Sequence, residues 1–160
     1  MGSQKIRELT AMAVTAGLYV ALCYAFAFMS YGFPQMRVAE VLLVLAFYNK
    51  KYCIPLILGT FIANALNGVY DMVLGTLATV IVLIVIITAK NKIIIAPAAA
   101  VINGLVIGFM LHYVFEVPYA LWFCMASVAL GEFAVVLAGV LAFSGIEKIN
   151  PKFIYMIKGE

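Results

Sequence analysis

Four ionisable residues stand inside apolar stretches of this chain, and they are the first candidates for chemistry. Arg37 and Glu40 are three residues apart, Asp71 begins a long apolar run, and Glu132 lies well inside another. A carboxylate in apolar surroundings must face a polar cavity or a partner, or be protonated, because burying an isolated charge is costly. These residues predict a site for a polar solute. The structural alternatives are a local Arg37–Glu40 salt bridge, a helix N-cap at Asp71 and an internal pair at Glu132.

Amide and aromatic side chains accompany the ionisable residues. Asn64 and Asn67 share one helix face, Asn103 falls near the middle of an apolar run, and Gln35 directly precedes the Arg37 region. Trp122 stands near a segment boundary, where it could stack on a solute or anchor at the membrane interface. The candidate substrate-binding residues are Gln35, Arg37, Glu40, Asn64, Asn67, Asp71, Asn103, Trp122 and Glu132.

The loop of residues 31–36 precedes this set and is predicted to cap the site. It supplies two aromatic rings, Tyr31 and Phe33, next to a proline. All the candidate positions map to the outer half or the middle of the predicted membrane segments, which suits capture of a solute from outside.

Patterns typical of catalysis and of metal binding are missing from the sequence. Cys23, Cys53 and Cys124 form no CxxC pair, and no HExxH, GxSxG or GxxxxGK[ST] motif occurs. We therefore predict a protein that is not an enzyme, that binds no metal and no cofactor, and that has no ATPase site of its own. No basic cluster with interleaved aromatics suggests a nucleic acid partner.

Composition identifies the elements that must position these residues. Apolar residues make up 67% of the 160 residues and charged residues 11%, against about 45–50% and about 25% in soluble domains. The fold is predicted to be an all-α integral membrane protein, with one transmembrane domain over residues 1–160. Its six transmembrane helices are predicted at residues 6–29, 38–49, 52–67, 71–89, 93–114 and 119–143.

The basic residues predict the orientation of these helices. With a cytoplasmic N-terminus, nine of the ten Lys and Arg residues lie inside and only Arg37 lies outside, as the positive-inside rule requires. The C-terminus is then cytoplasmic too. Merging the two short helices at 38–49 and 52–67 would bury Lys50 and Lys51, each at about 2.5–3.5 kcal/mol, so a hairpin is favoured.

The first predicted helix carries a stripe of small residues, Ala13, Gly17, Ala21 and Ala25, at four-residue spacing. Small residues allow another helix to approach closely within a membrane. The partner could be another helix of this chain or another membrane protein. Similar pairs, at Gly59 and Ala63 and at Gly104 and Gly108, are interpreted as internal packing.

Five short blocks of the sequence are distinctive: QMRVAE at 35–40, GTFIAN at 59–64, DMVLGTLAT at 71–79, NGLVIG at 103–108 and the Gly-Glu pair at 131–132. Taken together, these blocks resemble the QueT family. QueT proteins are substrate-binding S components of energy-coupling factor (ECF) transporters, associated with uptake of queuosine precursors. The similarity covers about residues 8–148, nearly the whole chain.

The resemblance implies a fold, partners and a location. The fold is the six-helix, ECF S-component-like one with both termini cytoplasmic. The partners are a transmembrane coupling protein and two cytoplasmic ATPases, in the plasma membrane of a prokaryote. The first helix of such proteins docks on the coupling protein through an alanine-rich motif, which assigns that role to the small-residue stripe. The loop between the first two helices caps the site.

The implied substrate is a 7-deazaguanine such as preQ1, preQ0 or queuine. Its pyrimidinone edge presents adjacent N–H donors, which a carboxylate of Glu132 or Glu40 could accept. Its carbonyl oxygen needs donors such as Arg37, Gln35 or an Asn amide, and a cationic aminomethyl group would favour Asp71.

Two other interpretations stay open on the sequence. One is an S component for another vitamin-like heterocycle. The other is a self-contained, ion-coupled carrier of small solutes that uses Glu132 as its proton site.

Overall fold

In the computed structural model, which describes residues 2–30 and 35–159, with side chains from residue 5 onward, the chain is helical. No strand occurs in these two ranges, so the predicted all-α class is confirmed. The elements are α1 (Gly2–Ala25), α2 (Ala27–Ser30), η1 (Val38–Leu43), α3 (Val44–Tyr48), η2 (Lys50–Tyr52), α4 (Cys53–Ala65), η3 (Asp71–Gly75), α5 (Thr76–Thr88), η4 (Lys92–Ile94), α6 (Ile95–Tyr113), α7 (Leu121–Ile149) and α8 (Pro151–Lys158). Three of the η elements are 3-10 helices and η3 is a π-helix.

Four stretches are long and apolar enough to cross a membrane: Lys5–Ala25, Asp71–Thr88, Lys92–Tyr113 and Leu121–Ile149. Val38–Tyr48 is apolar but shorter, and α4 has 13 residues. Helices therefore occupy all six predicted positions, while six complete crossings remain a prediction.

Two boundaries differ from the prediction. The first predicted helix, 6–29, is divided, because α1 ends at Ala25 and α2 begins at Ala27. The last, 119–143, continues to Ile149 and is followed by the amphipathic helix α8, which we did not predict. Hydropathy identifies only the apolar part of a helix. The helix α7 continues beyond its apolar part through charged residues such as Glu147 and Lys148.

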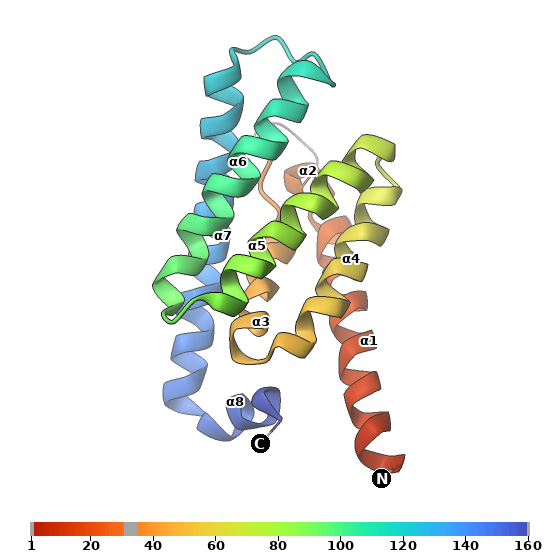
Figure 1. Cartoon of the computed structure of the whole chain (residues 1–160), viewed down its shortest axis with the longest axis vertical. Helices are drawn as coiled ribbons and strands as arrows, with labels where there is room; N and C mark the ends of the chain where they lie inside the picture. The colour runs from red at the N-terminus through yellow and green to blue at the C-terminus, as the bar shows by residue number, and fades with distance from the viewer. Residues whose placement is uncertain (1, 31–34, 160) are drawn as a thin grey trace.

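The helices form a bundle around the short segments η1 and α3. In Figure 1, α6 and α7 lie side by side, α1 lies along α4, and both termini are at the same end. Glycines allow the close contact of α6 with α7. A Cβ at Gly104 would lie 2.8 Å from the Ala129 Cβ, and one at Gly108 would lie 2.5 Å from the Met125 Cα.

The pair at Gly59 and Ala63 also packs internally, between α4 and α1. A Cβ at Gly59 would lie 2.8 Å from the Tyr19 Cβ. Ala63 is fully buried, and its carbonyl accepts a hydrogen bond of 3.1 Å from the Tyr24 hydroxyl. The predicted internal role of both glycine pairs is confirmed.

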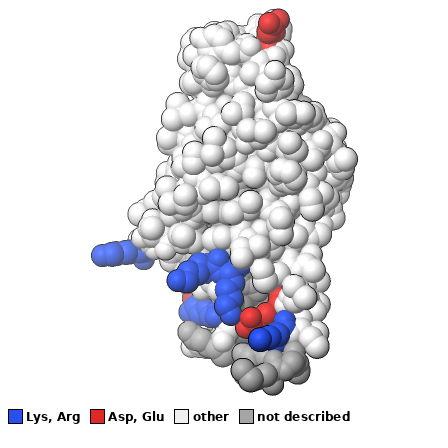
Figure 2. All heavy atoms as spheres, turned by 45° about the vertical axis from the view of Figure 1, so that its right-hand side comes forward, with Lys and Arg blue, Asp and Glu red and all other residues white. Residues whose placement is uncertain are grey.

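Charged side chains are distributed unevenly along the bundle. On the face shown in Figure 2, Lys and Arg gather towards one end, and the surface between the two ends carries none. Large apolar side chains such as Leu18, Ile84 and Leu141 are exposed along the helices. An uncharged band with outward apolar side chains is the surface expected of a protein in a lipid bilayer.

Candidate functional site

The chain enters the interior of the bundle as an extended segment, residues 35–37, just before η1. Gln35 is 4% exposed and Arg37 is 2% exposed. Gly131 of α7 makes room for this segment, because a Cβ there would lie 2.6 Å from the Gln35 carbonyl oxygen. Non-helical backbone is tolerated at membrane depth only where protein or a water-filled cavity surrounds it. The Arg37 side chain accordingly lies in the core, and its predicted position on the outer side of the membrane stays a prediction.

The 3-10 helix η1 begins at Val38 with Arg37 as its extended N-cap residue, and it carries Glu40 in its first turn. The Glu40 N–H donates to the Arg37 carbonyl at 2.9 Å. The Glu40 side chain is fully buried, and its Oε1 accepts a hydrogen bond of 2.8 Å from the hydroxyl of Tyr19 on α1. Glu40 is thus held from two elements.

Arg37 forms its ion pair with Asp71 rather than with Glu40. Its Nη2 lies 3.8 Å from the Asp71 Oδ1, and both side chains are buried. Asp71 makes no N-cap hydrogen bond, because the helix already includes Tyr70. Two structural alternatives to a solute site were a local Arg37–Glu40 salt bridge and an N-cap at Asp71. Neither occurs among the described residues.

The π-helix η3 brings α5 close to Arg37 and Asn64. A Cβ at Gly75 would lie 2.5 Å from the Asn64 Nδ2 and 3.2 Å from both terminal nitrogens of Arg37. Asn64 is 1% exposed. Single turns of π-helix frequently occur at functional sites, and here the turn carries Asp71 at its start and Gly75 at its end.

Glu132 of α7 belongs to the same cluster. It is 2% exposed, and its carboxylate lies close to the Arg37 backbone N–H and within electrostatic range of Glu40 and the Arg37 guanidinium. Asn103 of α6 is 1% exposed. Its neighbour Gly104 packs on α7 one turn before Glu132.

The buried charges of this cluster do not balance. In the described part of the chain, the buried charged side chains are one cation, Arg37, and three acids, Glu40, Asp71 and Glu132. All three acids interact electrostatically with the Arg37 guanidinium. The site therefore has an excess of negative charge when its acids are ionised.

Many polar atoms of the cluster also lack a hydrogen-bond partner among the residues that the structure describes. They include acceptors and donors, and they are Gln35 Oε1, Arg37 Nη1 and Nη2, Glu40 Oε2, Asn64 Nδ2, Asp71 Oδ1 and Glu132 Oε2; both side-chain polar atoms of the buried Asn103 on α6 are unpaired as well. Buried polar groups in proteins are normally paired, and each exception calls for an explanation. A polar ligand that presents both donors and acceptors would satisfy this set.

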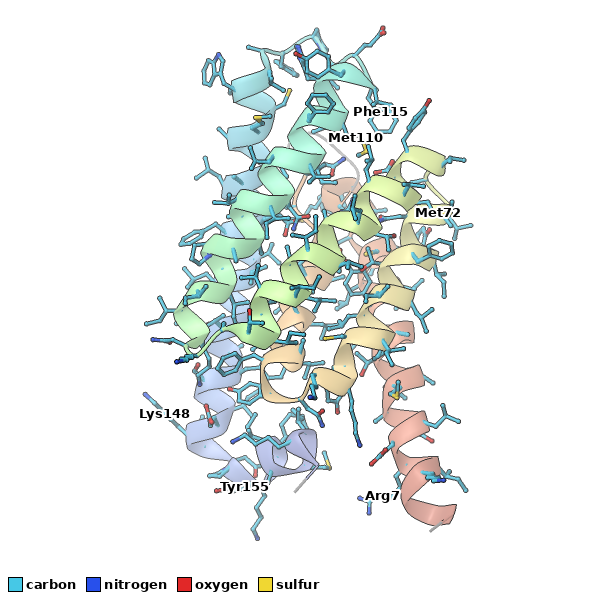
Figure 3. All side chains as sticks on the ribbon, in the orientation of Figure 1. Arg7, Met72, Met110, Phe115, Lys148 and Tyr155 are labelled. Carbon is cyan, nitrogen blue, oxygen red and sulfur yellow. The ribbon has the colours of Figure 1, made fainter. Side chains whose placement is uncertain are left out.

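The cluster lies towards the end of the bundle opposite the termini. In Figure 3, Met72, which follows Asp71 in η3, lies on the side of Met110 and Phe115, away from Arg7 and Lys148. This end would be the outer one if both termini are cytoplasmic, so the location in the outer half of the membrane segments stays a prediction.

Two predicted residues lie apart from the cluster, and two are not described. Trp122 is 72% exposed, which fits an interface anchor better than a stacking platform. Asn67 is exposed, and its side chain donates to the Ala63 carbonyl at 2.8 Å. The predicted cap residues, Tyr31 and Phe33, lie outside the described residues.

Sequence reasoning missed Tyr19, Thr60 and Thr79, which are fully buried. Tyr19 is the most important of these, because it contacts Glu40. The available signal was the spacing of Thr15, Tyr19 and Cys23, which form a buried face of α1 at four-residue intervals. We considered only the small-residue stripe of that helix.

The stripe itself faces away from the bundle. Ala13, Gly17, Ala21 and Ala25 are all exposed, and no atom lies within 4 Å of a Cβ built at Gly17. No described helix of this chain therefore packs on the stripe, and docking of the stripe on another membrane protein stays a prediction.

No group of three or more His, Cys, Asp or Glu residues suitable for a metal ion occurs in residues 2–30 and 35–159. The three buried acids of the cluster all interact electrostatically with the Arg37 guanidinium.

Comparison with known proteins adds an independent line of evidence. The sequence profile of the QueT transporter matches residues 9–148. The chain is 30% identical over 165 residues to the queuosine precursor transporter QueT of Lactococcus lactis subsp. cremoris (strain MG1363), covering 92% of this chain and 96% of that protein. No solved structure matches the chain.

Proposed function

The chain belongs to the QueT transporter family, and we propose that it is the substrate-specificity (S) component of an ATP-driven ECF importer for queuosine precursors. It binds preQ1, preQ0 or queuine from the outside. It then delivers the substrate by toppling in the membrane, in complex with a coupling protein and two cytoplasmic ATPases. The location is the plasma membrane of a prokaryote.

The single observation that carries this proposal is the buried cluster of unpaired polar atoms around Arg37. Leaving a buried donor or acceptor without a partner costs about 1–3 kcal/mol, and more for a charged group. Neither terminal nitrogen of the Arg37 guanidinium has a hydrogen-bond partner in residues 2–30 and 35–159. A bound solute would provide the missing partners, and that gain supplies binding energy.

A 7-deazaguanine matches the chemistry of this cluster. Its pyrimidinone N–H donors suit the unpaired Oε2 of Glu132, and its carbonyl oxygen suits Arg37 or the Nδ2 of Asn64. Hydrogen bonds to charged groups are stronger than those between neutral groups. The amides of Gln35 and Asn103 offer further contacts.

The exposed stripe on α1 supports a protein partner. Small residues on an outward face let a second helix pack closely against the backbone, and Gly17 has no intrachain neighbour at its Cβ position. We assign this face to the coupling protein, which would also connect the chain to its source of energy.

Calorimetry on the purified chain tests the substrate. We expect preQ1, preQ0 or queuine to bind with heat that is lost in Glu132→Gln, while thiamine and riboflavin give none. The exposed variant Glu116→Gln is the matched control and should bind as the original chain does. Binding of another vitamin in the absence of all three precursors would refute the substrate assignment.

Proteoliposomes test the need for partners. The chain alone should show no uptake under a proton gradient, whereas the complete complex with ATP should accumulate substrate. Uptake by the chain alone would identify it as a self-contained, ion-coupled carrier, and the ECF assignment would then be wrong.

A further inference from the structure

The helix α8 packs on the rest of the bundle through one of its faces. Ile154 and Ile157 are buried and belong to the hydrophobic core. The side chain of Asn49, which lies between α3 and η2, donates hydrogen bonds of 3.1 Å to the carbonyls of Ile157 and Lys158. These contacts determine which residues of α8 face outward.

The outward residues of α8 include a basic face. Lys152, Tyr155 and Lys158 follow one another at three-residue spacing, which makes them neighbours on the helix surface. The Lys158 Nζ lies 5.7 Å from the centre of the Tyr155 ring. Lys148 is exposed in the last turn of α7, shortly before α8 begins. We call Lys148, Lys152, Tyr155 and Lys158 the basic face.

The basic face carries more positive charge than the neighbouring acids balance. Among the described residues, no ion pair includes a lysine of this face, and Pro151–Lys158 contains no acidic residue. Glu147 lies within electrostatic range of Lys158, but its carboxylate is already ion-paired with Lys92 and accepts a hydrogen bond of 3.1 Å from the Tyr48 hydroxyl. An anionic partner would balance the remaining charge.

Exposed apolar side chains lie beside the basic face. Phe153 and Met156 of α8 are 39% and 59% exposed. Ile149, the last residue of α7, is 88% exposed, and it continues the apolar surface that α7 presents at Leu130 and Leu141. Helices that combine lysines with exposed aromatic and aliphatic residues are typical of the membrane interface. The helix α8 therefore begins where the exposed apolar surface of α7 ends.

We propose that the basic face binds the head group of an anionic phospholipid, with Phe153 and Met156 against the adjoining acyl chains. Lysines close to a membrane surface attract anionic lipids. The continuity with the apolar surface of α7 favours a lipid over a protein as the occupant. In Figure 3, Lys148 and Tyr155 lie at the same end of the bundle as Arg7. The substrate cluster lies towards the other end, so this inference does not rest on the proposed function.

Native mass spectrometry of the purified full chain in detergent, titrated with phosphatidylglycerol or phosphatidylcholine, tests this proposal. We expect the original chain to bind phosphatidylglycerol at least about tenfold more tightly than phosphatidylcholine, since each lysine near an anionic surface strengthens the attraction about fivefold. Replacing Lys148, Lys152 and Lys158 together by Gln should remove that preference.

The matched control replaces Lys5, Lys50 and Lys90 by Gln, which removes the same charge from exposed positions outside α8. This variant should keep the preference for phosphatidylglycerol, and both variants should unfold at the temperature of the original chain when no lipid is added. Equal affinity of the original chain for the two lipids would overturn the proposal, and so would an equal loss of preference in both variants. If the α8 variant keeps its lipid preference but no longer co-purifies with a coupling protein, α8 is a protein-docking surface and the lipid assignment is wrong.

Discussion

Arg37 and Asp71 form an ion pair of 3.8 Å between two elements that interrupt regular α-helix. Arg37 ends an extended segment before a 3-10 helix, and Asp71 begins a π-helix. Both side chains are buried, although neither terminal nitrogen of the guanidinium has a hydrogen bond within the described part of the chain. Regular helices satisfy their own backbone, so irregular backbone of this kind in a membrane protein is typical of binding sites.

Removing Arg37 should destabilise the protein more than removing Asp71. Arg37→Gln leaves three buried acids without a cation, and we expect a loss of about 3–5 kcal/mol in the free energy of unfolding. Asp71→Asn should cost less, because Arg37 keeps Glu40 and Glu132 within electrostatic range. Thermal unfolding in detergent measures both. The reverse order would contradict the assignment of Arg37 as the shared cation.

Tyr19→Phe should weaken substrate binding without changing the fold. The substitution removes the 2.8 Å hydrogen bond to Glu40. Such a hydrogen bond is worth about 1.5–3 kcal/mol when its acceptor is charged. Without it, the Glu40 carboxylate is no longer held in place within the site. We expect an affinity loss of about tenfold or more, measured by calorimetry. Tyr155→Phe, at an exposed tyrosine of α8, should bind normally. If both variants bind alike, Tyr19 does not position Glu40.

Gly75→Ala should reduce ligand affinity and leave the helices intact. The added Cβ would meet the Asn64 Nδ2 at 2.5 Å and the Arg37 terminal nitrogens at 3.2 Å, so both donors must shift. We expect at least about a tenfold loss, since truncating or displacing a buried charged contact costs 2 kcal/mol or more. Gly145→Ala, where nothing lies within 4 Å, is the control. Unchanged affinity in Gly75→Ala would place the ligand away from these donors.

Replacing Gly17 and Ala21 together by Leu should prevent assembly with the coupling protein and preserve ligand binding. Both positions are exposed on the outer face of α1, so large side chains there should clash with a docked helix and with nothing in the chain itself. Co-purification of the complex and calorimetry on the free chain measure the two effects. Leu18→Ala, at an exposed position between them, should assemble normally. Full assembly of the double variant would rule out this docking face.

Composition and local patterns of the sequence were sufficient to determine the helical membrane class, the positions of the main helices and the need to sequester Arg37, Glu40, Asp71 and Glu132. These are local properties. Hydropathy depends on residues that are neighbours in the sequence. Removing a charged side chain from water costs free energy whichever residue later pairs with it. The internal packing of Gly104 and Gly108 was predictable for the same reason.

The tertiary structure alone decided which of these residues meet. Arg37 pairs with Asp71 although Glu40 is nearer in sequence, because residues 35–37 run extended into the core and η3 turns Asp71 towards them. Tyr19 joins the site because α1 packs against η1 and α4, whereas Asn67 and Trp122 remain on the outside. Contacts between distant segments depend on how several helices pack at once, and no spacing within one segment encodes that arrangement.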